Sequence, residues 1–427
     1  MRHAIWLFAV VLARAETPSA IAIEGARVAT AAGPVLERAT VVLRDGLIEA
    51  VGENVALPPD AWVIPGKGLT VYPGLVDALS GLGLPQAESA APARGPAAPA
   101  ASPPPPRARG PEDRPFTQSW LRAADQVNAA DSRIAEARNA GFTSAVVFPT
   151  GGIFAGQGAR INLAGEKRRL IVEAPAGQYV SFTDRAFAAY PASLMGAIAY
   201  VRQVYLDAAH YQLHKQAYER EAGLKRPDYD RALEGVLESP RLLLPARNAA
   251  ELDRMVRFAG ELKAPAVLYG GHEAYQAAER IAKAGIPVLI SLRWPERPRE
   301  ADPDDVEPLR VLELRERAPS SPAALAKAGA RFAFYSDGTP LRDMRKAVKK
   351  AIDAGLSRAD ALRALTLGAA EIYRLDRRVG SIEKGKIANL VVTDGDLFEE
   401  KTRLKFIFID GVKFEPVEVQ PAPEAKS

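Results

Sequence analysis

The residue types that most restrict the chemistry of this chain are histidine and cysteine. Its 427 residues include four histidines and no cysteine. The missing thiols exclude thiol catalysis, thiolate metal sites, disulfides and attachment of a lipid to an N-terminal cysteine. His3 lies in a predicted leader, so the mature chain would keep fewer histidines still. The count therefore excludes a metal site built from four histidines.

His210 and His214 are four residues apart, which places both imidazoles on one face of a helix. Such a pair can bind a metal ion. No glutamate stands between them, and tyrosine, glutamine and lysine occupy the neighbouring positions. We therefore favour an ordinary amphipathic helix over a ligand pair.

The first fifteen residues have the order of parts of a signal peptide. A short basic start, Met1 to His3, precedes an apolar run from Ala4 to Ala13, and Ala13-Arg14-Ala15 offers an A-x-A cleavage site. The apolar run has about ten residues, too few to span a bilayer. We expect residues 1–15 to be removed and the protein to be periplasmic or secreted, with no membrane attachment after cleavage.

Both ends of the remaining chain have the alternation of apolar and polar residues that is typical of strands. Residues 21–28 and 39–51 alternate in this way, and Asp45-Gly46 in the second segment is a strong hairpin signal. Further short strands are predicted at 62–64, 380–382, 388–393 and 406–409. The simplest arrangement is one small β-sandwich made from 16–72 and 376–416, followed by a tail at 417–427.

Between these ends, helix and strand patterns alternate. The predicted helices are 130–140, 249–262, 273–284, 323–328 and 341–354, and the predicted strands are 143–149, 265–269, 286–291 and 331–336. Strands separated by helices of this length indicate a parallel sheet. We therefore predict an α/β fold in which 73–375 form a (β/α)8 TIM barrel.

Residues 85–114 interrupt this pattern with a composition of mostly proline, alanine, glycine and charged residues. Such a segment buries too little apolar surface to become ordered, so we predict a disordered or polyproline-like insertion. The net charge of the whole chain is +4, and its basic residues are scattered among acidic ones. Nucleic acid is therefore not an expected partner, because binding it requires a clustered basic face.

Several segments resemble the amidohydrolase superfamily, in particular its exported, imidazolonepropionase-like members. The matching segments, in chain order, are VYPGLVDALSGLGLP (71–85), FPTGGIFAGQGARINLAG (148–165), LYGGHEAYQAAERIAKAGIPVLI (268–290), YSDGTP (335–340), ALRALTLGAAEIYRL (361–375) and RVGSIEKGKIANLVVTDGDL (378–397). The resemblance implies the same composite fold of barrel and terminal β-sandwich.

The resemblance also implies one or two divalent ions at the mouth of the barrel, held by histidines and carboxylates with one site left for water. The positions that match histidine ligands are Leu79, Gly81 and Pro245 in this chain, and Tyr179 lies near the place of a lysine. The retained candidate ligands are His272 and Asp337. Two protein ligands are one fewer than a catalytic zinc site generally has.

By this resemblance the protein would hydrolyse C–N bonds of small amides, cyclic amides or dipeptide-like compounds. The substituted positions lead us to expect a degraded metal site and weak or absent catalysis. One alternative is an active enzyme with a single divalent ion, such as zinc, on His272 and Asp337, with Asp337 catalytic. Others are a partner subunit of an active paralogue and an interaction protein that uses the proline-rich insertion. Acyl transfer by Ser80 or Ser336 is disfavoured, because neither lies in a G-x-S-x-G sequence.

Overall fold

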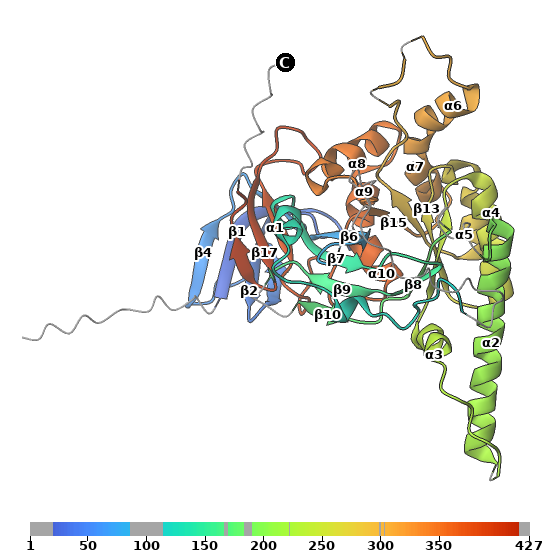
Figure 1. Ribbon diagram of the computed structural model, residues 1–427. Coiled ribbons are helices and arrows are strands. Elements are labelled where there is room, and N and C mark those ends of the chain that lie inside the picture. Colours follow the sequence, from blue (N-terminus) through green and yellow to red (C-terminus); the bar gives the residue numbers. More distant parts are fainter. Residues whose placement is uncertain are drawn as a thin grey trace, which may run out of the picture.

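The computed structural model describes residues 20–85, 114–165, 170–182, 190–221, 223–298, 300–302 and 304–417. In Figure 1, a sheet built from both ends of the chain lies beside a larger region of strands and helices. The predicted leader, nearly all of the predicted insertion and nearly all of the tail lie outside the described residues.

One sheet joins the two ends of the chain. Its strands are β1 (Ala20–Val28), β2 (Leu36–Arg44), β3 (Leu47–Gly52), β4 (Ala61–Pro65), β5 (Thr70–Pro73), β16 (Leu390–Thr393), β17 (Leu404–Ile409) and β18 (Val412–Phe414). The strand order is β18-β17-β16-β5-β1-β2-β3, with β4 paired to β1. Strands β16 and β5 are antiparallel, with Leu390 opposite Pro73 and Thr393 opposite Thr70. The expected union of the two chain ends is present, whereas its division into a two-layered sandwich stays a prediction.

Two Asp-Gly turns in this sheet lie against each other. Asp45 and Gly46, between β2 and β3, have φ angles of 50° and 79°, and Asp410 and Gly411, between β17 and β18, have 52° and 76°. Positive φ at both positions is the requirement of a type I′ hairpin turn. A Cβ atom on Gly411 would lie 2.8 Å from the Cα atom of Gly46. The hairpin predicted at Asp45-Gly46 is confirmed, and the contact shows how closely the two ends of the chain approach.

The remaining strands form two further sheets. They are β6 (Leu75–Ser80), β7 (Phe142–Val147), β8 (Phe154–Gln157), β9 (Ala159–Asn162), β10 (Ile171–Glu173), β11 (Gln178–Val180), β12 (Leu242–Ala246), β13 (Ala266–Gly270), β14 (Val288–Ser291) and β15 (Phe332–Tyr335). The orders are β10-β9-β7-β6 and β15-β14-β13-β12-β11-β8. Strands β6 and β7 are parallel, as are β11 to β15 in succession.

The predicted α/β class is confirmed, and one closed barrel stays a prediction. Strands β6 and β15 belong to different sheets, and hydrogen bonds from Ser336 to the Asp77 side chain connect them. Figure 1 shows helices packed around these strands. They are α1 (Ser132–Asn139), α2 (Leu194–Arg220), α3 (Arg231–Glu238), α4 (Ala249–Leu262), α5 (Ala278–Ala284), α6 (Leu309–Arg317), α7 (Ser321–Lys327), α8 (Met344–Asp353), α9 (Arg358–Ala364) and α10 (Leu367–Ile372).

The parallel strands are buried on both faces, which explains their continuous apolar sequences. Leu244 of β12, Ile290 of β14 and Phe334 of β15 belong to the core cluster that also contains helix residues such as Met255. Their chain neighbours Leu243, Leu289 and Ala333 belong to a second cluster, because side chains alternate along a strand. Each strand therefore contributes to two cores.

Three predicted elements differ in type over all or part of their length. Residues 380–382 are not a strand, because Gly380 has a φ of 95° and packs against Leu367. The helix predicted at 273–284 is α-helical only from Ala278, since Ala277 has a non-helical φ of −124°. The helix predicted at 341–354 starts as a 3-10 turn and becomes α-helical at Met344. Among the described helices, none combines the length and the apolar character needed to cross a membrane.

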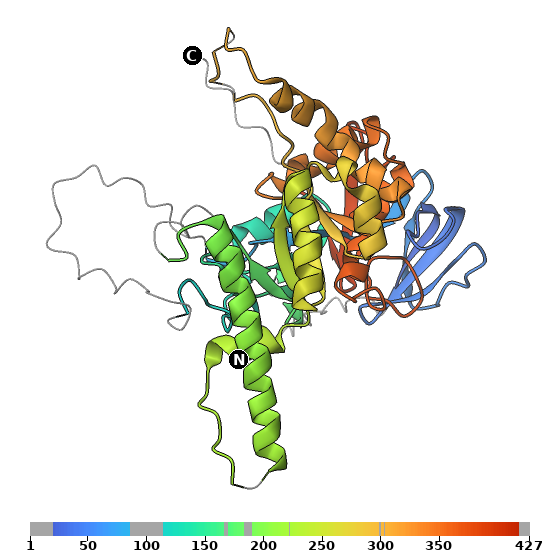
Figure 2. The ribbon, with the colours of Figure 1, turned by 90° about the vertical axis from the view of Figure 1, so that its right-hand side faces the viewer.

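Helix α2, which has 27 residues, extends beyond the body of the protein (Figure 2). Its buried residues near the N-terminal end, Ala197, Val201 and Val204, recur at helical spacing and pack into the core. His210 and His214 lie further along, where both are exposed and their ring centroids are 6.3 Å apart. The expectation of an ordinary helix at these two histidines agrees with this placement.

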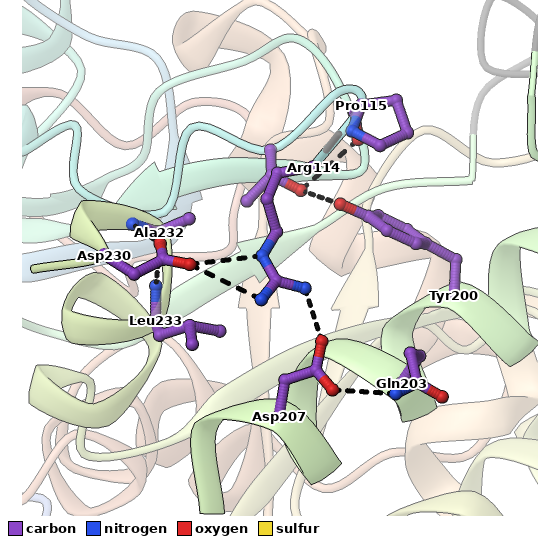
Figure 3. Close-up of polar contacts among 9 residues, drawn as sticks. Arg114, Pro115, Tyr200, Gln203, Asp207, Asp230, Ala232 and Leu233 are labelled. Atoms are coloured by element: carbon purple, nitrogen blue, oxygen red, sulfur yellow. Dashed lines mark hydrogen bonds and ion pairs between the residues drawn. The ribbon is translucent and has the colours of Figure 1, made fainter. Parts of the chain in front are cut away.

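Arg114 connects α2 to the start of α3 (Figure 3). Its Nη1 donates to Asp207 of α2 at 2.5 Å, and its Nη2 donates to Asp230 at 3.4 Å. Asp230 is also the N-cap of α3 and accepts from the backbone N–H of Ala232 and Leu233. These contacts help to fix the position of α2. Leu194, the first residue of α2, lines the candidate site described below.

Candidate active-site cavity

A cavity of about 600 Å³ lies at the carboxyl ends of the parallel strands. This is where parallel α/β folds place their ligand sites, because the loops that follow the strands converge there. Its walls come from the ends of β6, β7, β11, β12, β13 and β15 and from helix α4. Residues of particular interest in the lining are Leu79, Ser80, Gly81, Phe148, Thr150, Tyr179, Pro245, Arg247, Glu251, Arg254, Tyr269, Tyr335, Ser336 and Asp337.

The structure brings most of the residues singled out from the sequence to this cavity. Leu79, Gly81 and Pro245, the occupants of the expected histidine positions, all line it, as does Asp337. Asp337 follows β15 with a φ of 48°, a conformation that aspartate tolerates better than most residues. Its Oδ2 accepts a hydrogen bond of 2.9 Å from the Ser291 hydroxyl. One carboxylate candidate is therefore held in a defined orientation at the mouth.

His272 is placed differently. It does not line the cavity, and its ring lies 5.9 Å from that of Trp294. Its Nε2 is buried and has no hydrogen-bond partner among the described residues. Burial lowers the pKa of His272, although the nearby Asp337 carboxylate acts in the opposite direction. The imidazole is therefore neutral at neutral pH, and its Nε2 is enclosed by the protein.

Four aromatic side chains lie together in the lining of the cavity and form what we call its aromatic floor. Of these residues, only Tyr179 was a site candidate from the sequence. The Tyr179 and Tyr269 rings are stacked with centroids 5.1 Å apart, and the Tyr269 and Tyr335 rings are edge-to-face at 6.4 Å. Phe148 approaches Tyr179 at 5.9 Å. The Tyr269 hydroxyl donates to the carbonyl oxygen of Val180 at 2.8 Å. Burial raises the pKa of all three phenols, so they stay protonated at neutral pH.

Asp77 holds Ser336, a lining residue of the cavity, in place. It was not a site candidate from the sequence. It is completely buried and accepts hydrogen bonds from the Ser336 N–H at 3.0 Å and the Ser336 hydroxyl at 2.7 Å. Burial raises the pKa of Asp77 to about 6, although these hydrogen bonds lower it. Asp77 thus fixes the turn that carries Asp337. The sequence indicates this role only through the position of Asp77, a charged residue that follows an apolar run and precedes Leu79 by two residues.

The rim of the cavity carries two arginines. Arg247 and Arg254 are exposed, and their guanidinium groups form no ion pair within the described ranges. Glu251 lies between them in sequence and forms hydrogen bonds rather than an ion pair with either guanidinium group. Its carboxylate accepts from the Arg247 backbone N–H at 2.7 Å and from the Asn248 side-chain amide at 2.9 Å. Glu251 and Asp337 balance the two positive charges of the lining, but the two guanidinium groups can still pair with an anionic group of a bound molecule.

Fold and cavity together define a class, an α/β protein with a ligand cavity at the carboxyl ends of parallel strands and an additional sheet from both chain ends. The Amidohydrolase family model matches residues 233–420. An amidohydrolase from Thermotoga maritima MSB8 has a similar structure, with a TM-score of 0.74 and 26% identity over 92% of this chain and 100% of that one. The chain is therefore similar to amidohydrolases, in sequence over residues 233–420 and in fold over most of its length.

More distant structures share the fold alone. Phenylurea hydrolase B has a TM-score of 0.55 at 16% identity, covering 96% of this chain and 100% of that one. A prolidase complexed with N-methylphosphonate-L-proline has a TM-score of 0.53 at 17% identity, covering 93% and 99%. Adenine deaminase 1 of Desulfotalea psychrophila is 39% identical over 70 residues, which are 15% of this chain and 12% of that protein.

Amidohydrolases generally use divalent metal ions, so we compared the side chains of the cavity with the needs of such an ion. Within the described residues, no group of three histidine, cysteine, aspartate or glutamate side chains could hold one. The two carboxylates of the lining, Asp337 and Glu251, already accept hydrogen bonds from neighbouring groups. Leucine, glycine and proline supply no side-chain ligand. The described donor set therefore does not fit the metal centre of the family.

Proposed function

We propose that this protein is a member of the amidohydrolase family that binds a small amide or dipeptide-like molecule in its cavity with weak or no hydrolysis. The observation that carries the proposal is the occupation of the ligand positions. Leu79, Gly81 and Pro245 line the cavity where the resemblance predicts histidines, and His272 lies outside its lining. The metal site would then be degraded while the cavity is retained.

We also propose that the sheets have the barrel and sandwich arrangement that the resemblance implies. The parallel strands of the two sheets would form one (β/α)8 barrel, and the sheet from both chain ends would correspond to a β-sandwich. The parallel order of β11 to β15 and the contact between Asp77 of β6 and Ser336 after β15 support the first part. The pairing of β16 with β5 supports the second.

The charges and rings of the cavity suggest which molecules it would bind. Stacked tyrosines offer a flat apolar surface, and Arg247 and Arg254 offer guanidinium groups for a carboxylate. N-acetylphenylalanine and its amide are suitable probes, because they differ only in the group that would meet the arginines. We expect the acid to bind about tenfold more tightly than the amide, the effect of one charge-assisted hydrogen bond.

Calorimetric titration of three variants tests this preference. Arg247→Gln and Arg254→Gln should each reduce the preference for the acid. Arg257→Gln, on the same helix as Arg254 but outside the cavity lining, should leave it unchanged. Equal affinities for acid and amide in the wild type would contradict the proposed orientation, and absence of binding by either probe would contradict binding of this molecular class.

The degraded metal site is tested by elemental analysis. After equilibration with zinc and removal of excess ion, the wild type and Asp337→Ala should both contain far less than stoichiometric metal. Both should also leave simple amides and dipeptides intact, since the described donor set holds no ion. Stoichiometric zinc in the wild type, lost in Asp337→Ala together with amide hydrolysis, would overturn the proposal.

That opposite result would support a second candidate, a hydrolase with one ion held by His272 and Asp337. The buried, unpartnered Nε2 of His272 is the observation that favours it. His272→Gln should then also remove the ion. A role as the partner subunit of an active paralogue is compatible with the first proposal and would be detected by co-purification with that paralogue.

We also propose that the protein is exported to the periplasm or the exterior. The proposal rests on the basic start, apolar run and Ala13-Arg14-Ala15 site of the sequence. N-terminal sequencing of the protein recovered outside the cytoplasm should begin at Glu16. Recovery of the intact N-terminus from the cytoplasm alone would contradict it.

A further inference from the structure

Arg160 is a buried cation with few partners. It lies on β9 and is 1% exposed. Its Nη2 donates to the Ser144 hydroxyl at 3.3 Å, whereas its Nε and Nη1 are buried and have no partner within the described part of the chain. Burial lowers the pKa of Arg160 to about 10, so the guanidinium is still charged at neutral pH. A buried charge without a close counter-ion is strongly unfavourable, so an anion bound near Arg160 would be stabilised by it.

Arg160 lines a second cavity of about 340 Å³. Arg241, which immediately precedes β12, and Arg374, which follows α10, line the same cavity. Arg241 is 8% exposed and donates to the carbonyl oxygen of Ala176 at 3.2 Å. Arg374 is exposed and forms no ion pair within the described ranges. Three arginines from distant parts of the sequence therefore meet at one cavity.

The carboxylates at this cavity do not neutralise the three arginines. Glu238 is engaged by Arg122 at 2.9 Å and by the Gln157 side-chain amide at 3.3 Å. Glu173 is opposite Arg160 in the pair of β10 and β9, and its charge acts on Arg160 and Arg241, but it is exposed and forms no ion pair within the described residues. The balance of charge at the cavity is thus positive.

We propose that this second cavity binds a small oxyanion, either a phosphate or a carboxylate group, through Arg160, Arg241 and Arg374. The planar guanidinium group suits both, because its parallel N–H groups match two oxygens of one anion. The site is separate from the candidate active-site cavity. Arg241 and Arg247 lie before and after β12, a distance of about 15–20 Å along a strand.

The test is calorimetric titration of the full-length protein with phosphate, sulfate and malonate in excess sodium chloride at constant ionic strength. Phosphate and sulfate report on tetrahedral anions, and malonate reports on carboxylates. We expect saturable binding of at least one of them. Arg374→Gln should weaken it about tenfold, the effect of one charge-assisted hydrogen bond. Arg377→Gln removes the same charge three residues further along the chain, outside the cavity lining, and should bind as the wild type does.

Arg160→Met is the decisive variant. Its anion binding should be lost, while its melting temperature without anion should be equal to or above that of the wild type, because the unpaired charge is gone. If this variant fails to fold, the comparison of Arg374→Gln with Arg377→Gln decides. The proposal is overturned if none of the three anions binds saturably, or if Arg374→Gln and Arg377→Gln bind identically.

Discussion

As the pH rises from about 3 to about 7, the free energy of unfolding should fall by about 3 kcal/mol more in the wild type than in Asp77→Asn. Burial raises the pKa of Asp77, so over this window the native state binds more protons than the unfolded state. Stability therefore decreases with rising pH. The contribution is fully present below the unfolded pKa and is lost above the native one.

Urea unfolding at several pH values, followed by circular dichroism, measures this difference. Asparagine keeps the size of the side chain and can accept from the Ser336 N–H, but it does not titrate. Asp337→Asn is the matched control, because Asp337 is only partly buried and directly follows Ser336, the residue that Asp77 binds. Parallel curves for the wild type and Asp77→Asn would show that Asp77 ionises with an ordinary pKa in the folded protein.

Replacing Phe148 by alanine should reduce the free energy of unfolding by about 3–5 kcal/mol. The ring is 1% exposed and packs against Tyr179 at 5.9 Å and Tyr373 at 6.4 Å. Gly158 leaves space for it, since a Cβ there would lie 2.3 Å from a ring carbon of Phe148. Removing the ring therefore opens a void under the aromatic floor of the cavity.

Equilibrium urea unfolding of a short series tests this expectation. Phe148→Leu should lose less than Phe148→Ala, because it fills more of the void. Tyr229→Ala removes an aromatic ring that is 78% exposed and should change stability little. A loss in Phe148→Ala no larger than in Tyr229→Ala would mean that the aromatic floor is not a packed part of the core.

The sequence was most informative where structure depends on neighbouring residues. The helix predicted at 249–262 has those bounds in the structure, because Asn248 caps it through its own side chain and apolar residues recur along one face. The Asp45-Gly46 turn could be predicted for the same reason, since its positive φ angles are a property of the two residues themselves. The break at Ala277 could not, because no residue there signals it.

At the candidate site, motifs led to Leu79, Gly81, Pro245 and Asp337, which line one cavity. They also led to His272, which the structure places outside that lining. The aromatic floor could not be assembled from sequence, because Tyr179, Tyr269 and Tyr335 are about 70–90 residues apart on three strands. Nothing local indicates that their rings meet.

The sequence by itself determined the α/β pattern, the joining of the two chain ends and the scarcity of metal ligands, because these follow from periodicity, turn residues and a count of histidines. Only the tertiary structure decided the burial of Asp77 and Arg160. Both are charged residues on strands, and a strand does not reveal which of its polar side chains will be enclosed. Their pKa shifts and unmet hydrogen bonds arise from desolvation, which exists only once distant segments have packed around them.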